Sequence, residues 1–141
     1  MSINARANEI VTSLKGFDDW EDRYREIIKW GKKLPALEDE YKTEDFKVKG
    51  CQSQVWLVPN FKSGVISFKA DSDASIVRGI ISLFVHVYSG SSPMEILSFK
   101  PNFVDDIGLR QHLSMSRANG LNSMLKKITI YAMAFQAKSQ L

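Results

Sequence analysis

The chain has 141 residues, of which 44% are hydrophobic and 25% charged, a composition that predicts one globular domain and excludes disordered and collagen-like classes. Its single cysteine excludes an intrachain disulfide, an all-cysteine zinc site and an iron–sulfur cluster held entirely by thiolates of this chain. The net charge is +3 and the charged residues after Asp106 are all basic, but aromatic residues do not interleave with them, so we expect no nucleic-acid binding.

The first 34 residues predict two helices. Apolar residues recur at helical spacing from Ile3 to Leu14, and Gly16 ends this run. Asp18 or Asp19 can cap a second helix, whose apolar stripe is formed by Trp20, Tyr24, Ile27 and Ile28. We expect the breakers Gly31 and Pro35 to end this helix. The N-terminus lacks the apolar stretch of a signal peptide, which favours a cytoplasmic protein.

Residues 46–70 change to the alternating pattern of strands. Segments 46–49, 55–58 and 65–70 predict a three-stranded antiparallel meander, with turn signals at Pro59-Asn60 and Ser63-Gly64. In the third segment the alternation predicts three side chains facing the core, those of Ile66, Phe68 and Ala70.

Helical patterns return after this sheet. Residues 76–88 predict a buried central helix, which is too short for the roughly 20 residues that a membrane span needs. A capping box at 92–95 starts another helix, short helical turns follow at 103–107, and Ser116 opens a long final helix. The order of these elements predicts a single α+β domain over residues 1–141, with helices packed on one face of a small sheet.

Cys51 is the strongest candidate for chemistry. It follows Gly50, whose conformational freedom suits the tip of a turn, and precedes the polar residues Gln52, Ser53 and Gln54. Lys47 and Lys49 raise the local potential, which favours the nucleophilic thiolate. The alternative is an inert structural cysteine, since free cysteines are among the most buried residues.

Two histidines could serve as a base for Cys51. His86 lies in the apolar helix, where a hydrogen-bonded core histidine is expected, whereas the role of His112 in its loop stays open. The acids and histidines stand at no ligand spacing, so we expect no metal site.

The segment Gly50-Cys-Gln-Ser-Gln-Val-Trp56 resembles the signature of the SufE family of sulfur-acceptor proteins. Ser114-Met115 stands where the family pattern has Thr-Pro. Further matches follow in order along nearly the whole chain: Trp20-Glu-Asp-Arg-Tyr24, Ile27-Ile28, Gly31, Leu34-Pro-Ala-Leu37, Asp71-Ser-Asp-Ala74, Ile76-Val77, Gly79, Gln111-His-Leu113, Ser116-Arg117 and Gly120-Leu121.

This resemblance implies a carrier of activated sulfur with an α+β fold related to that of IscU-type scaffolds. Cys51 would take the outer sulfur of a persulfide from a pyridoxal-phosphate-dependent cysteine desulfurase and stimulate that enzyme. The sulfur would then pass to an iron–sulfur cluster scaffold. The resemblance implies no cofactor for this chain, whose Gly50, Gln52, Ser53 and Gln54 would support the cysteine loop.

Asp73, Arg117 and His112 are candidates for docking to the desulfurase, because residues near the Cys51 loop should lie at the contact and the resemblance places their segments among the family's motifs. Structural alternatives are that Asp73 caps the helix beginning near Ala74 and that Arg117 pairs with an acid inside the domain. Other functions stay open: a regulator that acts by docking alone, a CsdE-like paralogue that feeds another acceptor such as tRNA modification, and a Cys-His hydrolase. The oligomeric state is open, a homodimer included.

Overall fold

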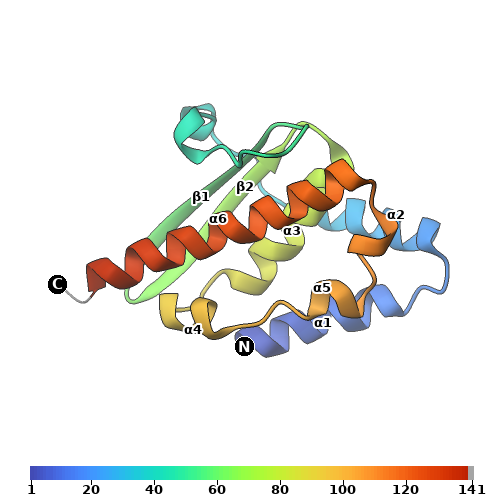
Figure 1. Cartoon of the computed structure of the whole chain (residues 1–141), viewed down its shortest axis with the longest axis horizontal. Helices are drawn as coiled ribbons and strands as arrows, with labels where there is room; N and C mark the ends of the chain where they lie inside the picture. The colour runs from blue at the N-terminus through green and yellow to red at the C-terminus, as the bar shows by residue number, and fades with distance from the viewer. Residues whose placement is uncertain (140–141) are drawn as a thin grey trace.

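The computed structural model describes residues 1–139 and confirms the α+β class (Figure 1). Short 3-10 turns, η1 (Asp39–Tyr41), η2 (Glu44–Phe46) and η3 (Arg110–His112), lie between the main elements. The main elements are, in order, α1 (Ile3–Lys15), α2 (Trp20–Lys32), β1 (Val55–Lys62), β2 (Val65–Ser72), α3 (Ser75–Tyr88), α4 (Pro93–Ser98), α5 (Phe103–Asp106) and α6 (Met115–Ser139).

The sheet of the described residues is an antiparallel hairpin of β1 and β2, in register from Val55↔Ser72 to Lys62↔Val65. Ser63 and Gly64 both have positive φ, 55° and 81°, as a tight hairpin turn of matching twist requires. The core-facing residues of β2 are buried and the residues between them are exposed, as the alternation predicted. The strand β1 continues through Pro59 and Asn60, where the sequence predicted its end.

The expected third strand at 46–49 is wrong. Phe46 belongs to the turn η2, and Lys47 forms a single isolated bridge to Trp56. One backbone bond, from Val48 N to Val55 O at 2.8 Å, marks the start of a ladder that does not extend. The next bond of that ladder would join Phe46 N to Leu57 O, but Phe46 N donates to Thr43 O at 3.3 Å and Leu57 O accepts from Tyr131 OH at 3.0 Å.

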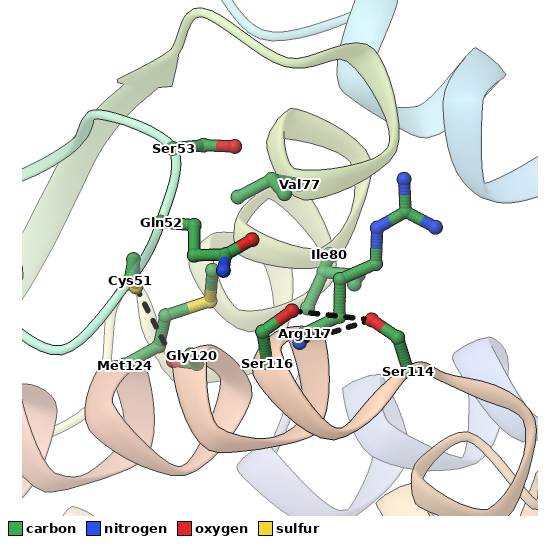
Figure 2. Close-up of a pocket in the computed structure, with 10 residues that line it drawn as sticks. All are labelled: Cys51, Gln52, Ser53, Val77, Ile80, Ser114, Ser116, Arg117, Gly120 and Met124. Carbon is green, nitrogen blue, oxygen red and sulfur yellow. Dashed lines mark hydrogen bonds between the residues drawn. The ribbon is translucent and has the colours of Figure 1, made fainter.

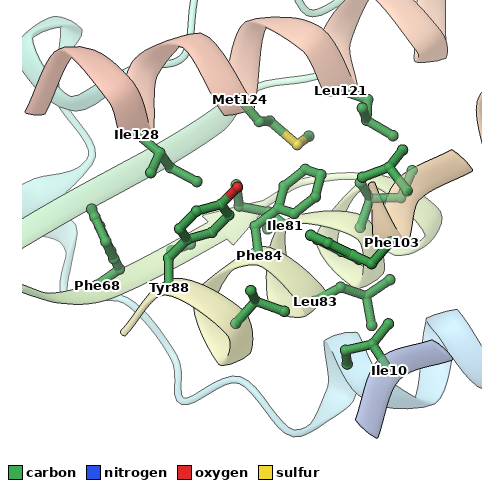
Figure 3. Packing of buried hydrophobic residues seen from close by; sticks show 14 of the residues in the cluster. Ile10, Phe68, Ile81, Leu83, Phe84, Tyr88, Phe103, Leu121, Met124 and Ile128 are labelled. Atoms are coloured by element: carbon green, nitrogen blue, oxygen red, sulfur yellow. The ribbon is translucent and has the colours of Figure 1, made fainter. Parts of the chain in front are cut away.

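Helix α3 runs through the centre of the core, where side chains from α1, α5, α6 and β2 surround it (Figure 3). A Cβ on Gly79 would lie 2.3 Å from Ile27 O, and one on Gly31 would lie 2.7 Å from Gly79 N. These two glycines therefore let the backbones of α2 and α3 touch. Gly31 lies inside α2 rather than ending it, because the close approach outweighs the helical cost of glycine.

Helix α6 lies across the hairpin and carries one of its ends toward the start of β1 (Figure 1). Tyr131 OH donates to Leu57 O at 3.0 Å, and the rings of Phe135 and Phe61 stack with centroids 4.9 Å apart. These contacts hold α6 on the hairpin and so place its N-terminal half beside the segment before β1, which contains Cys51. No helix within residues 1–139 is long and apolar enough to cross a membrane.

Candidate functional site

Cys51 lies in the loop between η2 and β1, half-buried against α6. Its thiol donates to the carbonyl oxygen of Gly120, with Sγ and O 3.6 Å apart, and Figure 2 shows this contact between loop and helix. A Cβ on Gly120 would stand 3.2 Å from Sγ, which is tighter than an ordinary contact. Gly120 therefore gives the sulfur room to rest on the helix backbone.

Gly50 begins the loop in a conformation that a side chain would oppose. Its φ is +94°, and a Cβ there would lie 2.5 Å from the hydroxyl oxygen of Ser123 on α6. The backbone angle requires glycine, as the sequence predicted, and a side chain there would also displace the Ser123 hydroxyl.

Asp73 holds the other end of the loop. Its Oδ1 accepts from Gln54 N at 3.0 Å, and its backbone N donates to Gln54 O at 3.3 Å. The expectation that Asp73 caps α3 is wrong, because the N-cap residue is Ala74 and no side chain caps that end of the helix. Asp73 instead ties the loop to the segment after β2.

A pocket of about 370 Å³ opens beside the Cys51 thiol (Figure 2). Val77 and Ile80 of α3 and Met124 of α6 give it an apolar wall, and Arg117 is the one charged residue among those that line it. The remaining lining residues are polar or lack a side chain: Gln52, Ser53, Ser114, Ser116 and Gly120.

The electrostatics differ from the sequence interpretation. Burial raises the pKa of the Cys51 thiol above its ordinary value, so the resting thiol is protonated at neutral pH. Lys47 is paired with Glu44, with Nζ and Oε1 3.7 Å apart, and Lys49 is exposed. The expectation that these lysines promote the thiolate is therefore wrong for this structure, in which the Cys51 loop rests on α6.

Arg117 stands in the first turn of α6, where its backbone N donates to Ser114 Oγ at 3.3 Å. Within residues 1–139 no acid pairs with its guanidinium, so the expected ion pair inside the domain is not present there. In Figure 2 the guanidinium points away from Cys51 across the pocket.

Neither histidine lines the pocket. His112 Nδ1 lies 2.9 Å from Gly108 O, and its ring stacks on Trp20 with centroids 3.9 Å apart. His86 Nε2 lies 3.4 Å from Glu9 Oε1, so His86 is hydrogen-bonded as expected, but its side chain is partly exposed rather than part of the core. The arrangement does not support the Cys-His hydrolase, and the described residues contain no cluster of three metal-ligating side chains.

Sequence reasoning missed what α6 contributes to the site. Gly120 was quoted only as part of a motif, and Ser123 and Met124 were not assigned to the loop or the pocket. One signal was available: a glycine inside a helix costs roughly 1 kcal/mol relative to alanine, so its presence indicates that something packs closely there.

Comparisons with known proteins identify the family of the chain. Residues 8–132 match the SufE family model, described as an Fe-S metabolism associated domain. The chain is 43% identical over 129 residues to an uncharacterized SufE-like protein of Rhizobium etli, covering 88% of this chain and 87% of that protein. It is 35% identical over 128 residues to another from Synechocystis, covering 91% and 80%.

The fold is similar to a solution structure of a hypothetical protein from Thermus thermophilus, with a TM-score of 0.75 and 19% identity. That similarity covers 92% of this chain and 94% of the other, and it concerns the fold alone. The family model spans most of the sequence and includes both Cys51 and the α6 residues that meet it. The chain belongs to the SufE family, whose domain is associated with iron–sulfur metabolism.

Proposed function

We propose that this protein accepts sulfur on Cys51 from a cysteine desulfurase that uses pyridoxal phosphate, stimulates that enzyme, and passes the sulfur to an iron–sulfur cluster scaffold. The observation that carries the proposal is the position of Cys51, the one cysteine of the chain, at the wall of a pocket with an apolar side. Membership in a family associated with iron–sulfur metabolism supports the same role.

The transfer is a thiol–disulfide type of exchange. The Cys51 thiolate attacks the outer sulfur of the persulfide on the desulfurase cysteine. The S–S bond of the donor breaks, its electron pair stays on the donor cysteine as a thiolate, and a new S–S bond forms on Cys51. The proton that Cys51 loses balances the thiolate that the donor becomes, so the step consumes no oxidant or reductant.

The resting geometry suits storage rather than attack. Burial disfavours the thiolate, and the Gly120 carbonyl accepts the thiol proton's hydrogen bond. Withdrawing the loop from α6 would remove both effects and return the thiol to water, where the thiolate forms more readily. Docking of the donor is therefore the step that would activate Cys51.

The pocket has room for the sulfur that Cys51 would carry. Its volume of about 370 Å³ is many times the roughly 30 Å³ share of one liquid water molecule. A persulfide turned toward Val77, Ile80 and Met124 would meet apolar surface and would be shielded from thiols in solution. Such shielding protects a group that other thiols would otherwise reduce.

Mass spectrometry tests the proposal directly. After incubation with a desulfurase and cysteine, the wild-type protein is expected to gain roughly 32 Da per sulfur atom, and reductant removes the gain because a persulfide is an S–S species. The matched control is Cys51→Ser, which keeps the size of the side chain. Equal reducible mass on the Ser variant would refute the assignment.

The half-buried, protonated state of Cys51 is the observation that favours a regulator acting by docking alone. In that case Cys51→Ser would stimulate the desulfurase as strongly as the wild type does. A carrier would lose its stimulation with the same substitution. The paralogous branch that feeds another acceptor is distinguished by the recipient, through transfer of labelled sulfur from Cys51 to a scaffold or to tRNA-modifying proteins.

A further inference from the structure

Met115 is the most exposed large hydrophobic residue among those that the structure describes, at 81%. It stands at the edge of the Cys51 pocket, because its two neighbours along the chain, Ser114 and Ser116, both line that pocket. Met115 itself is the first residue of α6 and is not among the residues that line the pocket.

The fold does not require a large apolar side chain at this position. Ser114 supplies the cap of α6, since its Oγ accepts from Arg117 N. The first position of a helix accepts almost any residue, proline included, because its N–H has no partner within the helix. The apolar arm of Met115 therefore contributes little to folding and remains available for a partner.

We propose that Met115 is an apolar anchor on which the sulfur-donating desulfurase docks beside the pocket. This inference rests on the proposed function. The donor sulfur must come within about 2 Å of Sγ to form the new S–S bond. Because Gly50 lies against Ser123 of α6, Cys51 stays beside the pocket even when the loop opens, so the donor surface has to reach the pocket edge. Ser114, Ser116 and Arg117 line the α6 side of the pocket, and Met115 stands between them in the chain, so a protein seated on this edge meets Met115.

The chemistry of the complementary surface follows from the neighbouring residues. Arg117 lies two positions away and is without an acidic partner within residues 1–139. The partner surface that fits this edge is therefore an apolar socket flanked by a carboxylate. Methionine suits such a contact because its unbranched thioether adapts its shape to the socket.

The test compares two methionines of the same helix. Met115→Ala shortens the anchor, and Met115→Pro removes it while keeping a residue that the helix start tolerates. Met133→Ala is the matched control, because Met133 is 56% exposed on α6 but lies about 27 Å further along the helix. Each variant is titrated against a desulfurase that the wild-type protein stimulates, and both binding and stimulation are measured.

Both Met115 variants are expected to need ~10-fold more protein for half-maximal binding and stimulation, as the loss of one buried methionine contact implies. The Met133 variant should match the wild type, and at saturation all should form the Cys51 persulfide. Wild-type affinity in the Met115 variants, or equal weakening by Met133→Ala, overturns the anchor even if Cys51 carries sulfur. If the wild-type protein binds and stimulates a desulfurase through Met115 but gains no sulfur, the carrier function is refuted and the docking role of Met115 stands. A wild-type protein that no desulfurase binds overturns both.

Discussion

Replacing Asp73 with alanine tests whether its hydrogen bond to Gln54 keeps the Cys51 loop closed, that is, resting on α6. The substitution removes the carboxylate oxygen that accepts from Gln54 N at 3.0 Å, and leaves the backbone bond from Asp73 N to Gln54 O in place. Because Asp73 does not cap α3, the melting temperature should change little. The expected effect is a larger fraction of molecules with the loop open.

The size of the effect follows from the kind of hydrogen bond that is lost. Bonds to charged groups contribute roughly 1.5–3 kcal/mol, but both residues are exposed and water can replace the lost acceptor. We therefore expect about 1 kcal/mol, which raises the ratio of open to closed loops about fivefold.

The assay is the rate at which iodoacetamide alkylates Cys51, compared with free cysteine under the same conditions. The wild-type protein should react slowly in isolation and faster once a desulfurase binds, and Asp73→Ala should react about fivefold faster than wild type without the partner. Asp73→Asn keeps an acceptor oxygen and should recover most of the protection. Asp105→Ala, which breaks an exposed pair with Arg110 and leaves the bonds of Gln54 in place, is the control. Equal rates for wild type and Asp73→Ala would refute the closure by Asp73.

Three further predictions concern the same site. The pH midpoint for alkylation of Cys51 should lie above the ordinary 9.0, because burial raises the pKa of its thiol. The raised pKa contributes stability that is present below the ordinary value and is lost as pH rises through the folded-state pKa. Cys51→Ala should therefore abolish that part of the pH dependence of unfolding. Gly120→Ala should speed alkylation, because the new Cβ would lie 3.2 Å from Sγ and displace the thiol. It should not lower the melting temperature, because alanine favours the helix by roughly 1 kcal/mol relative to glycine. Unchanged alkylation would contradict this. Arg117→Ala should weaken desulfurase binding and reduce its salt dependence with no loss of thermal stability, and a lowered melting temperature with normal affinity would argue against docking.

Local patterns predicted the elements whose formation depends on local chemistry. The Ser92 side chain accepts from Glu95 N while the Glu95 side chain accepts from Ser92 N, as the capping box required. The third strand failed because a strand needs free donors and acceptors on both facing edges. The sequence pattern of 46–49 suits a strand, but the groups that would form the next bond, Phe46 N and Leu57 O, are bonded to Thr43 O and Tyr131 OH instead.

At the candidate site, too, local sequence predicted some features and missed others. Gly50 and the polar residues that follow Cys51 made this cysteine the candidate for chemistry from local sequence. The structure places these residues in a loop before β1, as predicted. The charge interpretation failed because the field at a thiol depends on where charges are paired in space, and Lys47 faces Glu44. The Gly120 carbonyl was out of reach of local reasoning, since it lies 69 positions from Cys51 in the chain.

Asp73 shows what decides between two roles that sequence cannot separate. A cap requires the side-chain oxygen to reach the first N–H groups of the helix, but Ala74 occupies the cap position and Gln54 offers a backbone N–H within 3.0 Å. The two ends of the loop are consequently held by different forces. Gly50 is held by packing, with Ser123 filling the space where a Cβ would be, whereas Gln54 is held by exposed hydrogen bonds that water or polar groups of a partner can replace. We therefore expect the loop to open from its Gln54 end, with Gly50 as the fixed point about which Cys51 leaves α6.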